Sequence, residues 1–328
     1  MSLVSVIIPL YNEEDNIQPL YKELCAVANK IQDNVEFILV DDGSKDHTVK
    51  VLKKITAGDS RVKLIKFRRN FGQTAAIAAG FDYADGEIIA VLDGDLQNDP
   101  AEIPRLIAKL NEGYDMVAGW RKDRKDAFLN RRLPSMIANK LISTITKVKL
   151  HDYGCSLKVM RSEVAKNLQL YGEMHRFIPA LANEMGINIC ELAVNHRPRI
   201  HGQTKYGISR TFRVVLDLLT VKFFLGYFKR PSHAFGFTGL VSSLFGALLL
   251  AYLMVEKFIY DMSIGSRPLL ILSVMLVIVG MQFLCFGLLA EILVRTYHES
   301  QNKKIYAVRE VWIAGEGSNQ SSSKVANI

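Results

Sequence analysis

The sequence predicts an α/β protein, with a parallel β-sheet covered by helices on both faces and two membrane-spanning helices after it. Three observations support this prediction. Short β-rich runs alternate with helix-like segments in the first part of the chain, polar residues follow those runs, and two long apolar stretches lie near the C-terminus. A chain of 328 residues is long enough for one large α/β domain with an appendage.

The first part of the chain contains four expected strands: Val4 to Pro9, Glu36 to Val40, Val62 to Phe67 and Glu87 to Leu92. The expected helices separate them: Ile17 to Ile31, Thr48 to Ala57 and Gln73 to Ala84. Ligands of such sheets bind beyond the carboxyl ends of the strands. Polar chemistry is therefore expected at one edge, where three strands end in Tyr11-Asn12-Glu13, Asp41-Asp42-Gly43-Ser44 and Asp93-Gly94-Asp95.

Two apolar stretches, Ala234 to Val255 and Pro268 to Val294, are each long enough to cross a hydrocarbon core of ~30 Å. A buried hairpin in a soluble protein is the alternative, and their length disfavours it. Basic residues precede the first stretch and follow the second, whereas the connector Glu256 to Arg267 carries two acids and two bases. The positive-inside rule therefore predicts a multi-pass protein of the cell inner membrane, with the N-terminal domain and both termini in the cytosol. The first apolar run lacks a basic leader, so it is expected to be a buried strand and not a signal peptide.

The net charge of +8 is unevenly distributed. Residues 1–120 carry 13 Lys/Arg against 19 Asp/Glu, residues 121–149 nine against two, and residues 197–230 eight against one. The basic segments contain two amphipathic patterns, at about 133–148 and 208–230, which we expect to lie in the lipid interface. For the first, packing on the domain core is an equally good interpretation. No nucleic-acid recognition motif is present, so a membrane surface or a phosphate ligand is favoured over nucleic acid.

These features divide the chain into a core (1–120), a second half of the same domain (121–207), an interfacial helix (208–230), two spans (231–300) and a partly disordered cytoplasmic tail (301–328). The four cysteines are far apart and form no C-x-x-C pair, so a zinc site or disulfide framework is not expected. Glycines in both spans predict close helix packing, and the exposed faces of a two-span anchor favour a homo-oligomer.

The most informative local feature is Asp93-Gly94-Asp95 at a strand end. Two carboxylates at this spacing can hold a hard cation that also bridges a diphosphate. Ordinary turn chemistry is the alternative. The expected helix start at Asp99-Pro100, an N-cap followed by the first helical residue, strengthens the cation interpretation because it defines a strand, an acidic loop and a helix.

Asp41-Asp42-Gly43-Ser44 occupies the corresponding place after another strand. A carboxylate there can accept from a base N–H or ribose hydroxyls, and Gly43 allows close backbone approach. An Asx turn capping the helix at Thr48 is an equally good interpretation. The sequence has no G-x-G-x-x-G after the first strand and no G-x-x-x-x-G-K-[ST], which disfavours a dinucleotide oxidoreductase and a P-loop nucleotidase.

Taken together, the motifs resemble those of inverting family-2 glycosyltransferases of GT-A fold. The motifs are Pro9-Leu10-Tyr11-Asn12-Glu13, Asp41-Asp42-Gly43-Ser44, Arg69-Asn70-Phe71-Gly72, Asp93-Gly94-Asp95-Leu96-Gln97, Asp152-Tyr153-Gly154-Cys155 and Gly202-Gln203-Thr204-Lys205-Tyr206. Within that family the chain resembles the polyprenyl-phosphate branch, which includes dolichol-phosphate mannose synthases and, with two C-terminal spans, bactoprenol (undecaprenyl-phosphate) glucosyltransferases of the GtrB type. Thr204 replaces the usual Ser of the last motif and keeps its hydroxyl.

The resemblance implies a Rossmann-like GT-A catalytic domain with interfacial helices, two transmembrane helices and a plausible homotetramer. It implies transfer of glucose from UDP-glucose to a polyprenyl phosphate for the cell envelope, with Mg²⁺ or Mn²⁺ held by Asp93 and Asp95. Donor contacts would come from Pro9, Tyr11, Glu13, Asp41, Asp42, Gly43, Ser44 and Asp93, with Gln97 beside the sugar. The charge of the phosphates would be balanced by three arginines: Arg121 on the donor side, and Arg131 and Arg132 on the acceptor side. For each of the three, a place on a solvated basic face attracted to anionic lipid is an equally good interpretation. Arg199, Thr204 and Lys205 would bind the acceptor phosphate.

The acceptor phosphate is largely ionised near pH 7, with a second pKa of ~6, so a strong general base is not essential. Asp152 is accordingly expected either as a base or positioning group, or as a support for the fold. A non-catalytic nucleotide-binding protein and a GDP-mannose-dependent transferase remain as alternatives. A processive synthase is disfavoured because the Q-x-x-R-W motif is absent.

Overall fold

The computed structural model describes residues 2–31, 33–122, 143, 148, 150–170, 172, 174–198, 231–265, 267–300 and 304–313. The expected interfacial helices therefore lie almost wholly outside the described residues. The chain forms two compact units, one built from Met1–Leu218 together with Lys303–Ile328, and the other from Leu219–Asn302.

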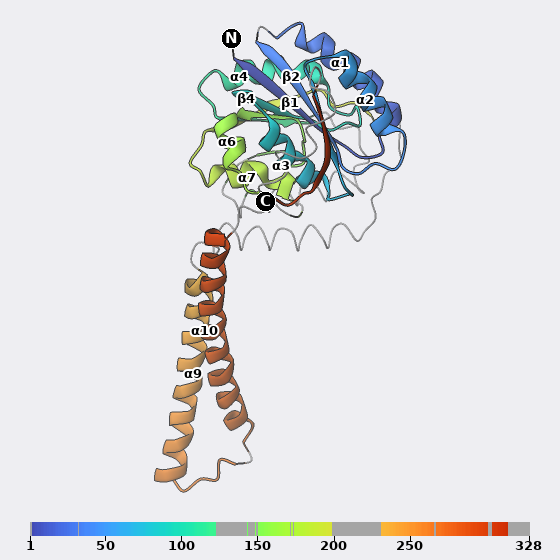
Figure 1. Ribbon diagram of the computed structural model, residues 1–328. Coiled ribbons are helices and arrows are strands. Elements are labelled where there is room, and N and C mark those ends of the chain that lie inside the picture. Colours follow the sequence, from blue (N-terminus) through green and yellow to red (C-terminus); the bar gives the residue numbers. More distant parts are fainter. Residues whose placement is uncertain are drawn as a thin grey trace. The chain divides into compact units, whose positions relative to one another are not determined.

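Within the described residues, the first unit contains an eight-stranded sheet with the order β7-β5-β6-β4-β1-β2-β3-β8 (Figure 1). The strands are β1 (Leu3–Leu10), β2 (Asn34–Asp41), β3 (Val62–Phe67), β4 (Ile88–Val91), β5 (Met116–Trp120), β6 (Lys158–Arg161), β7 (Ile189–Ala193) and β8 (Val308–Ile313). The four strands predicted from the sequence are confirmed, and they are mutually parallel. The sheet as a whole is mixed, because β6 runs antiparallel to β4 and β5, and β8 runs antiparallel to β3.

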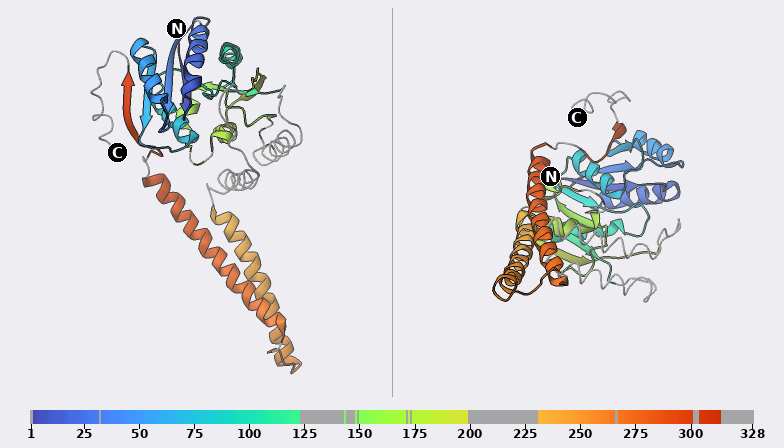
Figure 2. Two further views of the ribbon diagram at one scale, coloured as in Figure 1. Left: turned by 90° about the vertical axis from the view of Figure 1, so that its right-hand side faces the viewer. Right: turned by 90° about the horizontal axis from the view of Figure 1, so that it is seen from below.

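Alternating residues of β1 pack on different helices, which places helices on both faces of the sheet. Val6 and Ile8 belong to the core that also contains residues of α1, α2 and α4, whereas Ile7 meets α3 at Gly80. A Cβ on Gly80 would lie 2.2 Å from Cγ2 of Ile7, so glycine permits this close approach. The helices are α1 (Glu14–Ala28), α2 (Thr48–Gly58), α3 (Gln73–Tyr83), η1 (Pro100–Glu102), α4 (Ile103–Leu110), α6 (Ser162–Asn167), η3 (Met174–Phe177) and α7 (Ile178–Asn183) (Figure 1, Figure 2).

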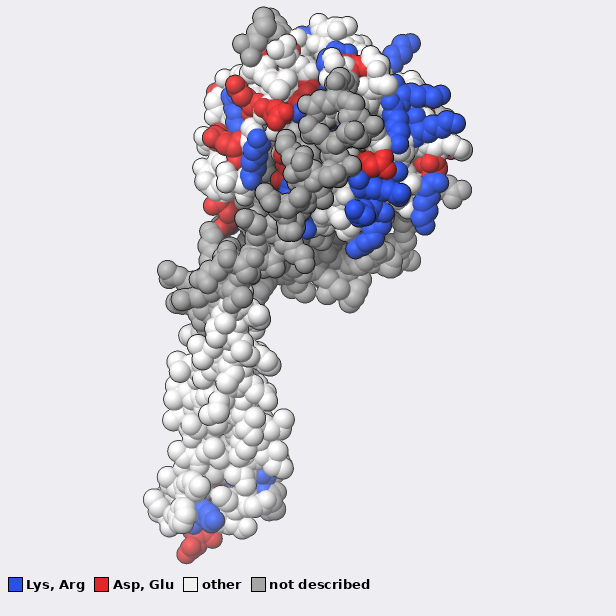
Figure 3. Space-filling view, viewed as in Figure 1, with Lys and Arg blue, Asp and Glu red and all other residues white. Residues whose placement is uncertain are grey.

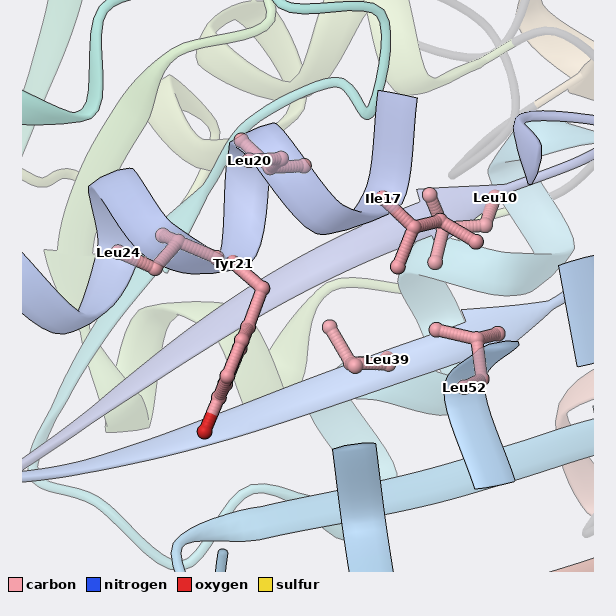
Figure 4. A pocket seen from close by; sticks show the side chains of 7 residues that line it. All are labelled: Leu10, Ile17, Leu20, Tyr21, Leu24, Leu39 and Leu52. Carbon is pink, nitrogen blue, oxygen red and sulfur yellow. The ribbon is translucent and has the colours of Figure 1, made fainter. Parts of the chain in front are cut away.

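A small pocket beneath α1 belongs to this core and not to a ligand site. It is lined by aliphatic side chains of α1, α2, β1 and β2 and by Tyr21 (Figure 4). The one hydroxyl on its wall, that of Tyr21, donates to Oδ2 of Asp59 at 2.6 Å. Its lining therefore offers packing surface, with no cluster of polar groups for a ligand.

The C-terminal segment contains a strand that the sequence analysis did not predict. Residues 301–328 were expected to form a partly disordered tail, but β8 pairs with β3 over a register that runs from Lys63 opposite Ile313 to Phe67 opposite Val308. Trp312 packs against the hydrophobic core of the first unit. The chain therefore re-enters the α/β domain after its two apolar helices.

The second unit is a hairpin of α9 (Pro231–Ile259) and α10 (Pro268–Ser300). Phe235–Ile259 and Pro268–Ala290 are long and apolar enough to cross a membrane, with mean hydropathies of 2.0 and 2.7. Only 17% and 11% of their apolar windows are buried, unlike core helices of a soluble protein. In the view of Figure 3, the charged residues drawn on the described part of the hairpin lie near the connecting loop.

Small residues hold the two helices close together, as the glycine spacing predicted. A Cβ on Gly239 would lie 2.6 Å from the carbonyl oxygen of Gly280, and one on Gly246 would lie 2.8 Å from that of Ser273. The hydroxyl of Ser242 donates to the carbonyl oxygen of Leu276 at 3.0 Å. These contacts lie within one chain and use the small-residue packing typical of membrane helices.

Candidate active site

The loops after β1 and β2 are bound to each other at the carboxyl edge of the sheet. The backbone N–H of Asn12 donates to Oγ of Ser44 at 3.0 Å, and that of Lys45 donates to Oδ1 of Asn12 at 2.9 Å. Asn12 has a φ of 55°, a left-handed conformation that asparagine tolerates better than most residues. The predicted donor residues Tyr11, Glu13, Gly43 and Ser44 therefore belong to one double loop.

Asp42 ties this double loop to the start of α3. Its carboxylate accepts from the backbone N–H groups of Phe71 and Gly72 at 2.6 and 2.9 Å. Burial raises the pKa of Asp42, and these two amide hydrogen bonds oppose the rise. Gly43 has a φ of 70°, and a Cβ there would lie 2.5 Å from the backbone carbon of Arg69. Asp42 thus positions the loop at residues 68–72, which we call the donor loop because it contacts two predicted donor residues, Asp42 and Gly43.

Asp41 forms a turn with Ser44, as in the alternative interpretation, but this turn does not cap α2. Both carboxylate oxygens of Asp41 accept from the Ser44 N–H at 3.3 Å, and the side chain is fully buried. The N-cap residue of α2 is His47, and the first helical N–H, that of Thr48, donates to Oδ1 of Asp46 at 3.0 Å. Asp41 therefore shapes the loop that presents Gly43 and Ser44.

The acidic loop after β4 is linked to α3 through Gln73, which the sequence analysis did not select. Nε2 of Gln73 donates to Oδ1 of Asp93 at 2.6 Å. Asp93 is partly exposed and Asp95 is buried. Desolvation and the neighbouring charge of Asp95 raise the pKa of Asp93, as expected for two carboxylates that share a site suited to a cation.

Backbone strain is concentrated in this loop. Leu96, between Asp95 and Gln97, has a φ of 61° while its side chain is buried. A left-handed conformation costs a leucine roughly 1–2 kcal/mol. The turn also directs the Gln97 N–H to Oδ1 of Asp95 at 3.2 Å, so the strained residue orders the acidic loop. The predicted helix start is confirmed, because Asp99 is the N-cap of η1 and accepts from the Ala101 N–H at 3.0 Å.

Arg121 and Asp152 form a bidentate ion pair beside the acidic loop. Nε and Nη2 of Arg121 donate to the two oxygens of Asp152 at 2.7 and 2.9 Å. Burial lowers the pKa of Arg121, but the hydrogen bond and charge of Asp152 outweigh it and leave the pKa raised. A Cβ on Gly154 would lie 2.9 Å from Nη2 of Arg121, which explains the glycine of this motif. Asp152 therefore orients Arg121.

A buried lysine near the acidic loop is a second residue that the sequence analysis missed. Lys158 of β6 is 3% exposed, and its Nζ donates to the carbonyl oxygen of Cys155. Burial lowers the pKa of Lys158, whereas the charges of Cys155, Asp152 and Asp93 oppose that change. Its only signal in the sequence is a lysine inside the apolar run Leu157 to Met160.

The first turn of α3 also contacts η3. Oγ1 of Thr74 and Nδ1 of His175 are 2.8 Å apart, and Thr74 is buried. Because Gln73 and Thr74 are consecutive, one helix start connects Asp93 with His175. No motif in the sequence analysis included His175.

The structure thus links several of the predicted donor-side residues, by hydrogen bonds, by neighbouring positions in the chain and by charge. The series runs from Asn12 through Ser44, Asp42 and α3 to Asp93, and then by charge to Arg121 and Asp152. Pro9 lies in β1 at the start of this edge. The predicted acceptor residues Arg131, Arg132, Arg199, Thr204 and Lys205 lie outside the described residues.

Acidic loops at the carboxyl edge of parallel strands, beside the half-buried Arg121, give this α/β domain a candidate ligand site. The protein belongs to glycosyl transferase family 2, whose model matches residues 5–169. It is 46% identical over 313 residues to dodecaprenyl-phosphate galacturonate synthase of Rhizobium johnstonii, covering 94% of this chain and 93% of the relative. It is 36% identical to undecaprenyl-phosphate 4-deoxy-4-formamido-L-arabinose transferase of Shewanella sediminis, covering 95% and 93%.

A solved structure supports the fold. Glucosyl-3-phosphoglycerate synthase from Mycobacterium tuberculosis, in complex with Mn²⁺, UDP and phosphoglyceric acid, superimposes with a TM-score of 0.53 and 19% identity, covering 67% of this chain and 78% of the other. The predicted GT-A fold is confirmed by this similarity and by the family match.

Proposed function

We propose that this protein transfers a sugar from a UDP-sugar to a polyprenyl phosphate, with inversion at the anomeric carbon, at the cytoplasmic face of the membrane. The observation that carries this proposal is the similarity along nearly the whole chain to two polyprenyl-phosphate sugar transferases. The linked donor-side residues and the two apolar helices support it, because such an enzyme needs a nucleotide site and access to a lipid.

Galacturonate is the donor sugar that we propose first. The sequence resemblance suggested glucose, but the relative with 46% identity is named for galacturonate, whereas the relative with 36% identity is named for a formamido-arabinose. Undecaprenyl and dodecaprenyl phosphates are the corresponding acceptors to test.

A divalent cation, Mg²⁺ or Mn²⁺, fits the acidic loop. Among the residues that the structure describes, no three His, Cys, Asp or Glu side chains come together as a metal cage. Magnesium is commonly held by one or two carboxylates together with substrate phosphates and water, which is what Asp93 and Asp95 can provide. When bound, the cation would neutralise the charge of the leaving diphosphate.

The protein's own groups would orient the reactants. The donor loop and Asp42 would hold the nucleoside end, and Arg121, fixed by Asp152, would face the diphosphate with a planar cation. Attack by the ionised acceptor phosphate needs no proton removal at pH values above its second pKa of ~6. Both oxygens of Asp152 accept from Arg121, which supports a positioning role for this carboxylate rather than that of a general base.

We further propose that both termini are cytosolic and that the protein forms a homo-oligomer. The pairing of β8 with β3 supports the topology, because the segments before and after the two helices join the same sheet. Cysteine-accessibility labelling that placed the N-terminal domain outside the cell would contradict it.

A donor panel tests the proposed function. Membranes containing the protein are incubated with radiolabelled UDP-galacturonate, UDP-glucose, UDP-N-acetylglucosamine or GDP-mannose, and the lipid extract is counted. We expect label in the lipid from UDP-galacturonate and matching release of UDP. Label from another donor alone would replace the sugar assignment, and no transfer from any donor would contradict the activity.

A further inference from the structure

The segment that follows the second apolar helix docks onto the α/β domain through several contacts. We call residues 304–313 the strap. Tyr306 is 6% exposed, its hydroxyl donates to Oδ2 of Asp82 at 2.5 Å, and Nζ of Lys304 lies 3.3 Å from the same oxygen. Burial and the hydrogen bond to Asp82 raise the pKa of Tyr306, so its hydroxyl stays protonated and remains a donor.

The strap touches the donor loop (residues 68–72) directly at one point and reaches it at a second through Phe67 of β3. The Arg68 N–H donates to the carbonyl oxygen of Ala307 at 3.0 Å. The ring of Tyr306 stacks on Phe67 with centroids 5.1 Å apart and planes 13° apart, and Phe67 meets Phe71 edge-on at 5.7 Å. An aromatic series therefore runs from the strap through β3 into the donor loop.

The donor loop thus has a support on each side. Asp42 and Gly43 hold it from the end of β2, and Tyr306 and Ala307 hold it from the strap. Between these supports Arg69 is exposed, and its guanidinium carbon lies 4.1 Å from the centre of the Phe71 ring. Since Phe71 both receives the aromatic series and supports Arg69, the strap can determine how Arg69 is presented.

We propose that Tyr306 is a positioning residue for the donor, acting through Phe67 and Phe71 on the donor loop, to which the proposed function assigns the nucleoside end. This inference rests on the proposed function, because it assigns a role within the donor site. Tyr306 lies six residues beyond the end of α10 at Ser300, so the strap follows the second apolar helix closely in the sequence. The strap then adds to the support that Asp42 and Gly43 give the donor loop.

Three variants in the full-length, detergent-solubilised protein test the proposal. Tyr306→Leu keeps apolar volume but removes the stacked ring, and Tyr306→Phe keeps the ring but removes the hydrogen bond to Asp82. Trp312→Ala is the matched control. Trp312 lies near the other end of β8, opposite Leu64, and Nζ of Lys53 lies over its ring, so the variant removes an aromatic ring from the same strap. For each variant we measure UDP affinity with Mn²⁺, the KM for donor, the KM for acceptor and the melting temperature.

We expect Tyr306→Leu to weaken UDP binding and raise the donor KM by about three- to tenfold, which corresponds to the loss of one aromatic pair. The acceptor KM should stay within about twofold of the wild-type value, which corresponds to a change in free energy of at most ~0.4 kcal/mol. Tyr306→Phe should retain wild-type donor affinity because the stack remains. Trp312→Ala should lower the melting temperature without the rise in donor KM.

Two results would overturn the inference. The first is an unchanged UDP affinity and an unchanged donor KM in Tyr306→Leu. The second is a rise in donor KM that is equal in Tyr306→Leu and Trp312→Ala when the two variants have equal melting temperatures. That result would indicate a general effect of stability. Failure of the proposed function looks different, because the wild-type protein would then neither bind UDP nor transfer sugar.

Discussion

Replacement of Asp152 by asparagine distinguishes a positioning carboxylate from a general base. Asp152 is 4% exposed, and its two oxygens accept from Arg121 at 2.7 and 2.9 Å, while the Gly154 N–H donates to Oδ1 at 3.1 Å. Removing one partner of a buried ion pair lowers the free energy of unfolding by about 3–5 kcal/mol. Because the side-chain amide of asparagine has the shape of the carboxylate and retains one acceptor oxygen, we expect a loss at the lower end of this range. At roughly 2–4 °C per kcal/mol for a domain of this size, the melting temperature should fall by roughly 6–12 °C.

Activity should fall together with stability, because an unfixed Arg121 loses its orientation toward the diphosphate. The assay is lipid-extracted transfer at several pH values, together with thermal unfolding in detergent. Asp59→Asn is a matched control, since Asp59 pairs with Arg61 through the same two-pronged geometry, at 3.0 and 2.7 Å, before β3. It should lower stability and leave transfer unchanged. An Asp152→Asn protein with the wild-type melting temperature and a loss of turnover that depends on pH would refute the reasoning and indicate a base.

Three further predictions concern the metal, the acceptor and the assembly. Asp95→Ala should abolish transfer, and chelation of the wild-type protein should do the same until Mg²⁺ or Mn²⁺ is restored; full activity of the variant in excess chelator would contradict the metal site. Lys205→Ala should reduce the rate of transfer to polyprenyl phosphate by roughly one to two decades, because a hydrogen bond to a charged group contributes ~1.5–3 kcal/mol. The affinity for UDP should not change. Lost UDP binding with normal acceptor kinetics would move this residue to the donor site. In mild detergent the wild-type protein should be oligomeric. Gln282 is exposed in the apolar part of α10, and its amide can form a hydrogen bond with another copy of the chain. Gln282→Leu should therefore shift the protein toward the monomer. Oxidative cross-linking at the exposed Cys285 measures this association, and a monomeric wild-type mass would contradict it.

The parts of the fold that the sequence predicted are those with strong local patterns. β3 begins and ends at the predicted residues, and β1, β2 and β4 differ by at most two residues at an end, because buried parallel strands are continuous apolar runs bounded by polar loops. The acidic loops were located for the same reason. Each follows such a run, and parallel strands bring their carboxyl ends to one edge.

The parts that were missed depend on contacts distant in sequence. Nothing local indicates that Gln73 meets Asp93, or that Thr74 meets His175, which lies 101 residues away. β8 was missed because Val308 to Ile313 is short and lies in a polar tail, and it becomes a strand only against the edge of β3. Its alternation of β-branched, charged and aromatic residues was the available signal.

The strand β8 also determines which fragments of this protein remain soluble. A fragment that stops before α9, the natural choice for a membrane-free catalytic domain, lacks the strand that covers β3. The backbone N–H and C=O groups of β3 that now pair with β8 would then face solvent, and such an edge pairs readily with other chains. A fusion in which a short linker replaces α9 and α10 and keeps residues 304–313 would cover that edge. Such a protein would remain monodisperse where the simple truncation aggregates.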